Sequence, residues 1–530
     1  MSLETRLKLL ADPAKTPELA NITRGIEKES LRVTPSGHLA QTPHPEPLGS
    51  ALTHSSITTD YSEALLEFIT APSASIEKVL EELEEIHHYT YQHMDDELLW
   101  VNSMPCQLGQ DSDIPVAKYG SSNIGRMKTT YRIGLGHRYG RLMQTIAGIH
   151  YNFSVPDSLW EWLKALDKSE LSLQDYKTQG YFSLIRNFRR YFWLLLYLLG
   201  AAPAVCNSFL KGRQHKLVPV NSDNHSMYTP YATSLRMGDL GYQSDAQSSL
   251  IVCYNNIENY VDTLQQALLF PYPQYQNIGL KGDKGEYRQL STHLLQIENE
   301  FYSPIRPKRT THSRETPIHA LCERGIEYIE VRCIDLNPLL ACGIDAETIR
   351  FLDTFLLFCL LKDSPQTDNR EYKQILENQR RTVYNGRDPE LRLQHGEHEI
   401  LLRKWGEALL AQMQPVADLL NQANQTDDYS RALNTMQARL ADDSLTPSAQ
   451  LLEEMHSHNE TYFRMAMRLA RKHRDYFQQR PVAENSFQKY RVLAEQSRQK
   501  QQQLEAADQG SFEEFLEDYY RQYQSTTALT

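Results

Sequence analysis

The sequence predicts an α+β protein whose last third is mostly helical. Up to about residue 362, short runs of alternating apolar and polar residues, as in strands, are mixed with the wider apolar spacing of helices. Beyond about residue 363, apolar residues recur every three or four positions, as in 400–423 and 449–477, which is typical of amphipathic helices. We therefore expect one catalytic unit over residues 1–530, with an α+β core over about 1–362 and a helical part over about 363–530.

The composition is that of an ordinary globular protein with an acidic balance. Hydrophobic residues make up 40% and charged residues 23% of the chain, and the formal net charge is -12. An acidic chain lacks the broad basic field that draws proteins to nucleic acid, so we expect no nucleic-acid partner. If the protein handles anions, it must hold them through local arginines, lysines and metal ions.

Neither the N-terminal residues nor the apolar segments indicate export or a membrane. Residues 1–17 lack the apolar stretch and cleavage site of a secretory signal, so a cytoplasmic location is expected. The longest apolar run, 191–205, is shorter than the ~18 to 20 residues that span a bilayer and contains Gly200 and Pro203. We expect a buried helix there and no membrane partner. The 7 cysteines show no CxxC spacing, which favours reduced thiols over disulfides or a zinc site.

The common nucleotide-binding motifs are absent from the sequence. Residues 120–127 (GSSNIGRM) have the glycine spacing of a P-loop, but Arg126 and Met127 stand where lysine and Ser/Thr are needed. Residues 134–140 (GLGHRYG) are one residue too long for the dinucleotide-binding GxGxxG motif. Phosphate binding, if present, should therefore be centred on metal ions.

Two carboxylates share one face of the strand expected at 24–31 (RGIEKESL). Glu27 and Glu29 are two residues apart, so both side chains point the same way. Two acids on one face repel each other unless a cation lies between them. Taken alone, such a pair is more often part of a solvated strand edge.

Two further segments place polar residues on one face of a strand. In 145–155 (TIAGIHYNFSV), apolar residues alternate with polar ones, so that His150 projects from the polar face. In 326–332 (IEYIEVR), Glu330 and Arg332 share a face. The alternatives are a hydrogen-bonded structural histidine and an ion pair without a catalytic role.

A fourth segment, 296–309 (QIENEFYSPIRPKR), combines acids with bases. The residues expected to align on one strand face are Gln296, Glu298 and Glu300. The basic residues expected in the loop that follows are Arg306, Lys308 and Arg309. That loop alone is more often a solvated charge run. Together, however, the four segments predict a sheet with glutamate, histidine and arginine on one face, and such ligands suit Mg²⁺ or Mn²⁺ bridging to nucleotide phosphates.

At these segments the chain resembles the glutamate-cysteine ligases of the proteobacterial type. The resemblance covers about residues 21–353, and the helical last third matches only loosely. The segments that carry it are RGIEKESLRV (24–33), ALTHSSITTDYSEALLEFIT (51–70), YGSSNIGRMKTTYR (119–132), LMQTIAGIHYNFS (142–154), PYATSLRMGDLGY (230–242), QIENEFYSPIRPKR (296–309) and RGIEYIEVR (324–332).

The resemblance implies a glutamine-synthetase-like fold, in which a curved, mainly antiparallel sheet forms the active-site funnel. It also implies an ATP-dependent reaction that joins the γ-carboxylate of glutamate to the amine of cysteine through a γ-glutamyl phosphate. That reaction is the first step of glutathione synthesis. The implied cofactor is Mg²⁺, with Mn²⁺ as an alternative, and the implied substrates are ATP, glutamate and cysteine.

The resemblance also assigns roles to particular residues. The metal-holding set is Glu27, Glu29, Asp60, Glu67, His150 and Glu330. Arg236 and Arg332 are expected to contact the anionic groups of glutamate or the transferred phosphoryl group. The wall of the cysteine pocket is expected to be Tyr61, Tyr131, Leu135, Tyr242 and Tyr302, with His150 nearby. Tyr61 stands where the family pattern has phenylalanine, so its hydroxyl changes the polarity of the pocket edge.

Two alternatives remain open at this point. One is a related carboxylate-amine ligase with another amine substrate, and the other is a catalytically silent protein that kept the fold. The sequence leaves open the oligomeric state, with a monomer as one option, the metal used in the cell, the group that accepts the amine proton, and the role of the last third.

Overall fold

The computed structural model describes residues 2–105, 107–220, 224–241, 245–247, 250–481 and 484–525. Its centre is a seven-stranded sheet in the order β2-β3-β1-β5-β10-β9, with β4 paired to the end of β1. Every pairing in this sheet is antiparallel, as expected. The strands are β1 (Thr23–Val33), β2 (Ile57–Thr59), β3 (Leu65–Ile69), β4 (Leu98–Leu99), β5 (Ile149–Ser154), β9 (Ile305–Lys308) and β10 (Tyr328–Ile334).

The two-residue repeat of the strands gives this sheet one apolar and one polar face. Ile26, Tyr151 and Val331 lie opposite one another on β1, β5 and β10, and all three are fully buried. Beneath this face, Asp353 of α10 accepts a hydrogen bond from the Tyr151 hydroxyl (2.6 Å) and pairs with Arg24 (3.0 Å). The apolar face is therefore anchored to α10, which leaves the other face for polar side chains.

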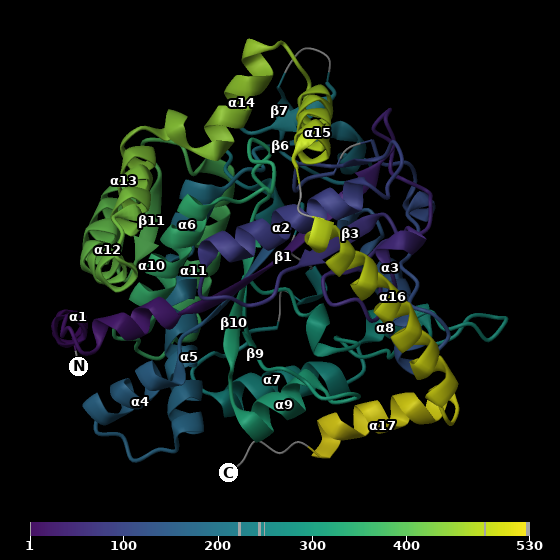
Figure 1. Ribbon diagram of the computed structural model, residues 1–530, viewed down its shortest axis with the longest axis horizontal. Helices are drawn as coiled ribbons and strands as arrows, with labels where there is room; N and C mark the ends of the chain where they lie inside the picture. The colour runs from purple at the N-terminus through teal and green to yellow at the C-terminus, as the bar shows by residue number, and fades with distance from the viewer. Residues whose placement is uncertain are drawn as a thin grey trace.

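Helices surround the sheet, and the helical last third is confirmed (Figure 1). The helices of the core are α1 (Leu3–Leu10), α2 (Ile76–Tyr91), α3 (Asn123–Tyr139), α4 (Asp157–Leu166), α5 (Leu173–Tyr191), α6 (Trp193–Leu199), α7 (Ile257–Leu269), α8 (Pro273–Ile278), α9 (Pro317–Arg324) and α10 (Ala346–Leu361). Those of the last third are α11 (Asn369–Asn385), α12 (Leu402–Asn424), α13 (Asp428–Ala441), α14 (Pro447–Ser457), α15 (Tyr462–Gln479), α16 (Glu484–Ala507) and α17 (Phe512–Ser525). Two small sheets complete the fold, β6 (Ala204–Cys206) with β8 (Ser226–Tyr228) and β7 (Val218–Pro219), and the hairpin β11 (Arg392–His395) with β12 (His398–Leu401).

The helices of the last third pack on the core at several places (Figure 1). α12 and α13 contact each other and α10, whereas α16 crosses α2 and α17 packs against α3, α7 and α9. The chain therefore returns over its own first half, and the division of the unit near residue 362 stays a prediction.

The apolar run 191–205 contains a buried helix, as expected, but this helix covers only about half of the run. All residues of α6 are buried, and the run continues into strand β6. Within the described ranges, none of the helices combines the length and apolar character needed to cross a membrane.

The expectation that all cysteines are reduced is wrong at one position. Cys253, Cys322, Cys333, Cys342 and Cys359 are free thiols, whereas Cys206 is disulfide-bonded. Cys106 lies outside the described residues. Sequence spacing could not reveal this bond, because a disulfide depends on which residues the fold brings together.

Candidate active site

The register of the central sheet brings acids and a histidine together on its polar face. Glu27 of β1 lies opposite His150 of β5, and Glu29 of β1 lies opposite Glu67 of β3. Two groups result whose ligand atoms lie within 4.8 Å of one another: Glu27, His150 and Glu330, and Glu29, Glu67 and His150. Since His150 belongs to both, the two groups form one continuous site.

Short contacts fix the orientation of these side chains. His150 Nδ1 lies 3.2 Å from Glu27 Oε2, and its Nε2 lies 3.7 Å from Glu29 Oε1. The Asn152 amide donates to Glu27 Oε1 (2.8 Å), and the Gly148 backbone N–H donates to Glu29 Oε2 (2.8 Å). The carboxylates are thereby held in place with lone pairs left for a further partner.

Basic side chains surround the group that contains Glu330. Lys308 Nζ lies 3.3 Å from Glu330 Oε1, and Arg332 Nη1 lies 3.0 Å from Glu330 Oε2. Burial alone would raise the pKa of Glu330, but the charges of Lys308, Arg332 and His150 outweigh it and hold that pKa well below its ordinary value. For Glu27, the His150 hydrogen bond similarly overcomes burial and lowers the pKa.

The second group carries an excess of negative charge. Burial, together with the neighbouring charges of Glu27 and Asp60, raises the pKa of Glu67 well above its ordinary value. Burial also raises the pKa of Glu29, which His150 only partly offsets. Crowded buried carboxylates of this kind are stabilised by a bound cation, and oxygen ligands with one imidazole suit Mg²⁺ or Mn²⁺. The donor set thus fits the expected metal.

Asp60 lies beside these groups but in neither of them. Its charge acts on Glu29 and Glu67, while its backbone carbonyl accepts hydrogen bonds from the Tyr119 hydroxyl (3.0 Å) and from Arg132. A role for its carboxylate as a metal ligand stays a prediction.

The two expected arginines meet at the same face. Arg236, in the short 3₁₀ helix η6 (Leu235–Met237), is fully buried and donates to the Arg332 carbonyl (2.9 Å). Its guanidinium lies against Gly148, where an added Cβ would be 1.9 Å from Nη2. Glycine is therefore needed at the entry to β5 so that Arg236 can reach the Glu29 side of the site.

Four of the five residues expected in the cysteine pocket can be placed. Tyr131 and Leu135 lie one turn apart on α3, and Tyr302 accepts a hydrogen bond from Gln144 Nε2 (3.1 Å). The hydroxyl of buried Tyr61 lies 2.6 Å from where a Cβ would stand on Gly136, and it has no hydrogen-bond partner among the described residues. Tyr242 lies outside the described residues.

One expected strand has a different structure. Residues 298–300 form the 3₁₀ helix η8 (Glu298–Glu300), and Arg306 and Lys308 lie on β9 instead of in a loop. The Glu300 carboxylate accepts the Gln296 backbone N–H (2.7 Å), and Glu298 accepts that of Ile318 (3.0 Å). Both carboxylates are thus engaged with backbone N–H groups, and neither belongs to the metal groups.

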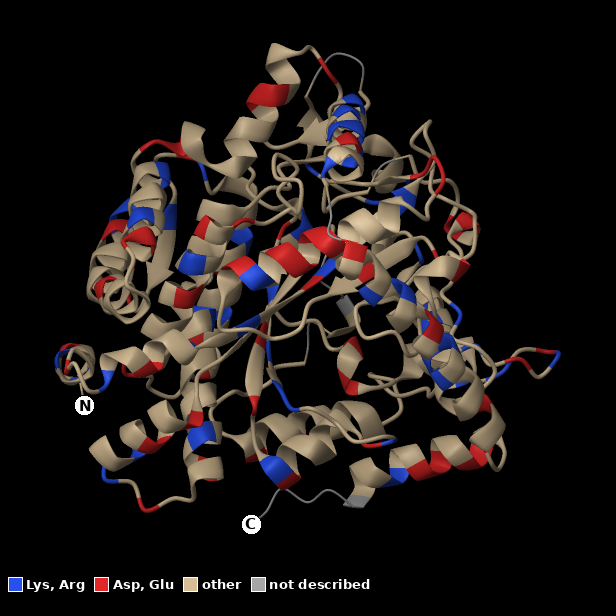
Figure 2. Ribbon diagram, viewed as in Figure 1, with Lys and Arg blue, Asp and Glu red and all other residues tan. Residues whose placement is uncertain are grey.

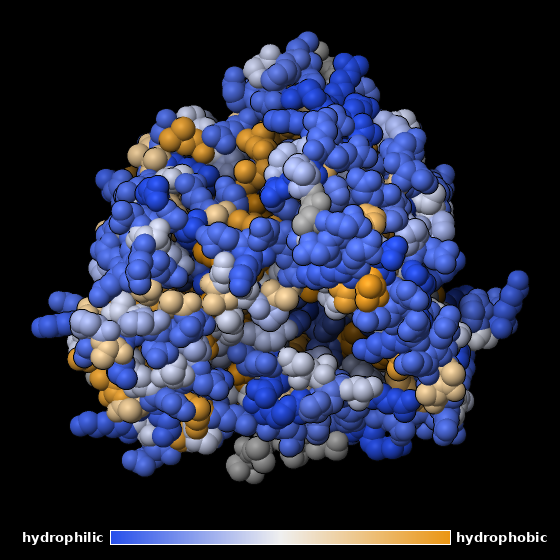
Figure 3. Space-filling model, in the orientation of Figure 1, coloured by the Kyte–Doolittle hydropathy of each residue, from blue (hydrophilic) through white to orange (hydrophobic). Residues whose placement is uncertain are grey.

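Sequence reasoning missed two basic residues on α3. Lys128 and Arg132 lie one turn apart beside the acids, and burial lowers the pKa of Lys128 to about 8 although Glu67 attracts its charge. The signal was present in residues 125–135 (GRMKTTYRIGL), where positions 128, 132 and 135 share a helix face. In the space-filling view, the molecular surface is hollowed to the right of the position of β9 and β10 (Figure 3). We interpret this recess as the entrance to the site.

The α+β fold, taken with the comparisons with known proteins, defines this chain as a ligase. The chain belongs to the glutamate-cysteine ligase family, which it matches over residues 7–382. Its activity is that of a glutamate-cysteine ligase, the first step of glutathione synthesis.

Relatives support this assignment over the full length. The chain is 53% identical to the glutamate-cysteine ligase of Alcanivorax borkumensis, covering 98% of this chain and 99% of that one. It is 51% identical to the enzyme of Pseudomonas putida strain W619, covering 98% of each chain. A crystal structure of the Francisella tularensis ligase in complex with AMP matches with a TM-score of 0.89 and 37% identity, covering 95% of this chain and 98% of that chain.

Proposed function

We propose that Glu27, Glu29, Glu67, His150 and Glu330 hold Mg²⁺, or Mn²⁺ in its place, for binding ATP, with Asp60 as a further contributor. The observation that carries this proposal is the pair of ligand groups joined at His150. The AMP bound to the related Francisella protein supports nucleotide binding. When bound, the metal ions would neutralise phosphate charge and polarise the transferred phosphoryl group.

The arginines orient the anionic partners of the first step. Arg332 and Arg236 are fixed in neighbouring positions, and planar guanidinium groups suit carboxylates and phosphoryl oxygens. The glutamate γ-carboxylate attacks the γ-phosphorus of ATP, so that ADP leaves and γ-glutamyl phosphate forms. No protein nucleophile is needed for this step.

The second step requires an amine held close to the acyl phosphate. Tyr131, Leu135 and Tyr302, with Tyr61 and Tyr242, form the proposed cysteine pocket. The cysteine amine attacks the activated carbonyl, loses a proton and expels phosphate, which gives γ-glutamylcysteine. Aromatic side chains around the thiol also keep water from the intermediate. We place the reaction in the cytoplasm, where the cysteine substrate is kept as a reduced thiol.

Isotope transfer tests the proposed intermediate directly. The enzyme is supplied with Mg²⁺, ATP, cysteine and glutamate labelled with ¹⁸O in the γ-carboxylate. An acyl phosphate transfers one ¹⁸O to the phosphate released for each γ-glutamylcysteine formed. Unlabelled phosphate would exclude this route, and product formation that continues after a chelator removes all divalent metal would exclude the metal role.

A further inference from the structure

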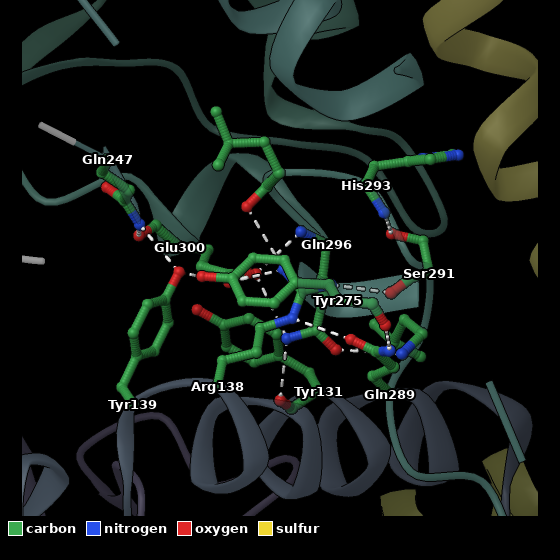
Figure 4. A network of polar contacts seen from close by, with 12 residues as sticks. Tyr131, Arg138, Tyr139, Gln247, Tyr275, Gln289, Ser291, His293, Gln296 and Glu300 are labelled. Carbon is green, nitrogen blue, oxygen red and sulfur yellow. Dashed lines mark hydrogen bonds and ion pairs between the residues drawn. The ribbon is translucent and has the colours of Figure 1, made fainter. Parts of the chain in front are cut away.

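A buried polar network joins α3 to the segment 289–300 (Figure 4). Its centre is the ion pair between Arg138 and Glu300, whose Nη1 and Oε1 atoms are 2.8 Å apart. Both side chains are fully buried. Buried charges destabilise the folded protein unless they are paired and hydrogen-bonded. The groups around this pair are therefore expected to be held in fixed positions.

Arg138 is held on all sides. Its guanidinium donates to Gln289 Oε1 (2.9 Å) and to the Ser291 carbonyl (2.7 Å), and it stacks over the Tyr275 ring at 4.1 Å. Figure 4 shows these groups converging on the guanidinium. Arg138 is therefore a rigid anchor, and it fixes Glu300 in one orientation.

Glu300 connects this anchor to Tyr131. Its second oxygen accepts hydrogen bonds from the backbone N–H (2.7 Å) and the side-chain amide (3.1 Å) of Gln296. The same amide donates to the Tyr131 carbonyl (3.2 Å). Gln296 can approach α3 this closely because Gly134 faces it, where an added Cβ would lie 2.1 Å from Gln296 Oε1.

Glu300 is also connected to Tyr302. The Tyr139 hydroxyl donates to Glu300 Oε1 (2.8 Å) and accepts from Gln247 Nε2 (3.1 Å). Gln247 Nε2 also donates to the Glu300 carbonyl (2.8 Å), and Gln247 Oε1 accepts the Tyr302 backbone N–H (3.1 Å). The backbone at Tyr131 and the backbone at Tyr302 are thus both connected to the Glu300 residue, through Gln296 and Gln247 respectively.

The C-terminal helix α17 closes this network from outside. The Tyr520 hydroxyl donates to the Gln296 carbonyl (2.7 Å), and the Tyr523 hydroxyl donates to Glu298 Oε2 (2.5 Å). The outer face of α17 is acidic and exposed, with Glu513, Glu514 and Glu517 (Figure 2). The aromatic side of the helix therefore faces the network, and its charged side faces solvent.

We propose that Glu300, held by Arg138 and covered by α17, is a positioning residue for amine recognition. It sets the separation of Tyr131 and Tyr302 and so determines how the ligase discriminates cysteine from other amines. This inference rests on the proposed cysteine pocket. It also gives the end of the chain a role in substrate selection.

The test is a steady-state comparison of Glu300→Gln with the unaltered enzyme. We expect KM for cysteine to rise about tenfold and the preference for cysteine over 2-aminobutyrate to shrink, while KM for ATP and for glutamate changes less than about twofold. The matched control is Asp353→Asn, which breaks the buried Arg24 pair on the opposite face of the sheet. It should lower stability without a selective change in KM for cysteine.

Two further variants make every outcome decisive. Tyr139→Phe removes only the hydroxyl between Glu300 and Gln247, and we expect it to raise KM for cysteine about threefold. If Glu300→Gln does not fold, this rise in Tyr139→Phe supports the proposal in its place. Leu135→Ala tests the pocket itself. If Leu135→Ala raises KM for cysteine but the folded network variant leaves KM and amine preference unchanged, the positioning role is wrong. If Leu135→Ala has no effect, the pocket assignment fails and the inference with it.

Discussion

At the residue scale, a substitution of Arg332 distinguishes a catalytic role of this side chain from a purely structural one. Its guanidinium lies 3.0 Å from Glu330 and 3.4 Å from His150. We expect Arg332→Lys to lose more than tenfold in kcat/KM, over ~1.4 kcal/mol, because an ammonium cannot reproduce the planar fork on a carboxylate or phosphate. Steady-state kinetics with glutamate as the varied substrate measure this. A lysine variant within tenfold of the parent would make Arg332 only an ion-pair partner of Glu330.

The amine preference is a second prediction for individual side chains. We expect the kcat/KM order cysteine, 2-aminobutyrate, serine at saturating ATP and glutamate. The methyl of 2-aminobutyrate keeps the shape but loses sulfur-aromatic contacts of about 0.3 to 1.5 kcal/mol each. The serine hydroxyl must instead be desolvated among aromatic rings. If serine exceeds 2-aminobutyrate, the pocket is polar, and the buried Tyr61 hydroxyl is the first group to replace by phenylalanine.

At the scale of elements, the entry to β5 decides where Arg236 can lie. In Gly148→Ala, the new Cβ would stand 1.9 Å from Arg236 Nη2, so the fully buried guanidinium must move. We expect kcat/KM to fall about 100-fold with the circular dichroism spectrum unchanged, since misplaced substrate contacts are costly. Gly25→Ala is the control, because its nearest contact is 3.6 Å away and should leave activity near normal. Equal activity in both variants would contradict the placement of Arg236.

Strands could be predicted from the sequence where apolar and polar residues alternate within a single short segment. The two-residue alternation of β1, β5 and β10 placed Glu27, His150 and Glu330 on one face, as the structure confirms. The pairing of Glu29 with Glu67 depends on strand order, which the alternation does not give, and Glu67 was expected in the site only through the family resemblance. The interpretation of 296–300 as a strand was wrong, because residues 298–300 form a 3₁₀ helix in which Glu300 accepts the Gln296 backbone N–H and Glu298 accepts that of Ile318. The contacts of α17 span more than 200 residues and leave no local signal.

For the whole molecule, buried histidines should set the response to acid. His473 of α15 donates from Nε2 to the Pro338 carbonyl (2.8 Å), and burial lowers its pKa to about 4. The unfolded chain, with a histidine pKa near 6.5, binds the proton first, so stability is present above about pH 6.5 and is lost as the pH falls. Between pH 7 and pH 5 we expect this histidine to cost about 2 kcal/mol.

Urea unfolding of His473→Gln at the two pH values isolates this contribution. Glutamine can still donate to the carbonyl but does not titrate, so the variant should lose about 2 kcal/mol less than the parent between pH 7 and pH 5. Equal losses would show that His473 is protonated in the folded protein.

In the proposed reaction, one polar sheet face, built around His150, holds the metal ions. The most direct test is a titration with Mn²⁺, followed by electron paramagnetic resonance, in the presence of a non-hydrolysable ATP analogue. The two ligand groups predict that Glu27→Gln and Glu29→Gln, each correctly folded, lose tight Mn²⁺ binding and most activity. If both variants bind Mn²⁺ as tightly as the parent and turn over normally at saturating Mg²⁺, the metal ions of the reaction do not bind on this sheet face.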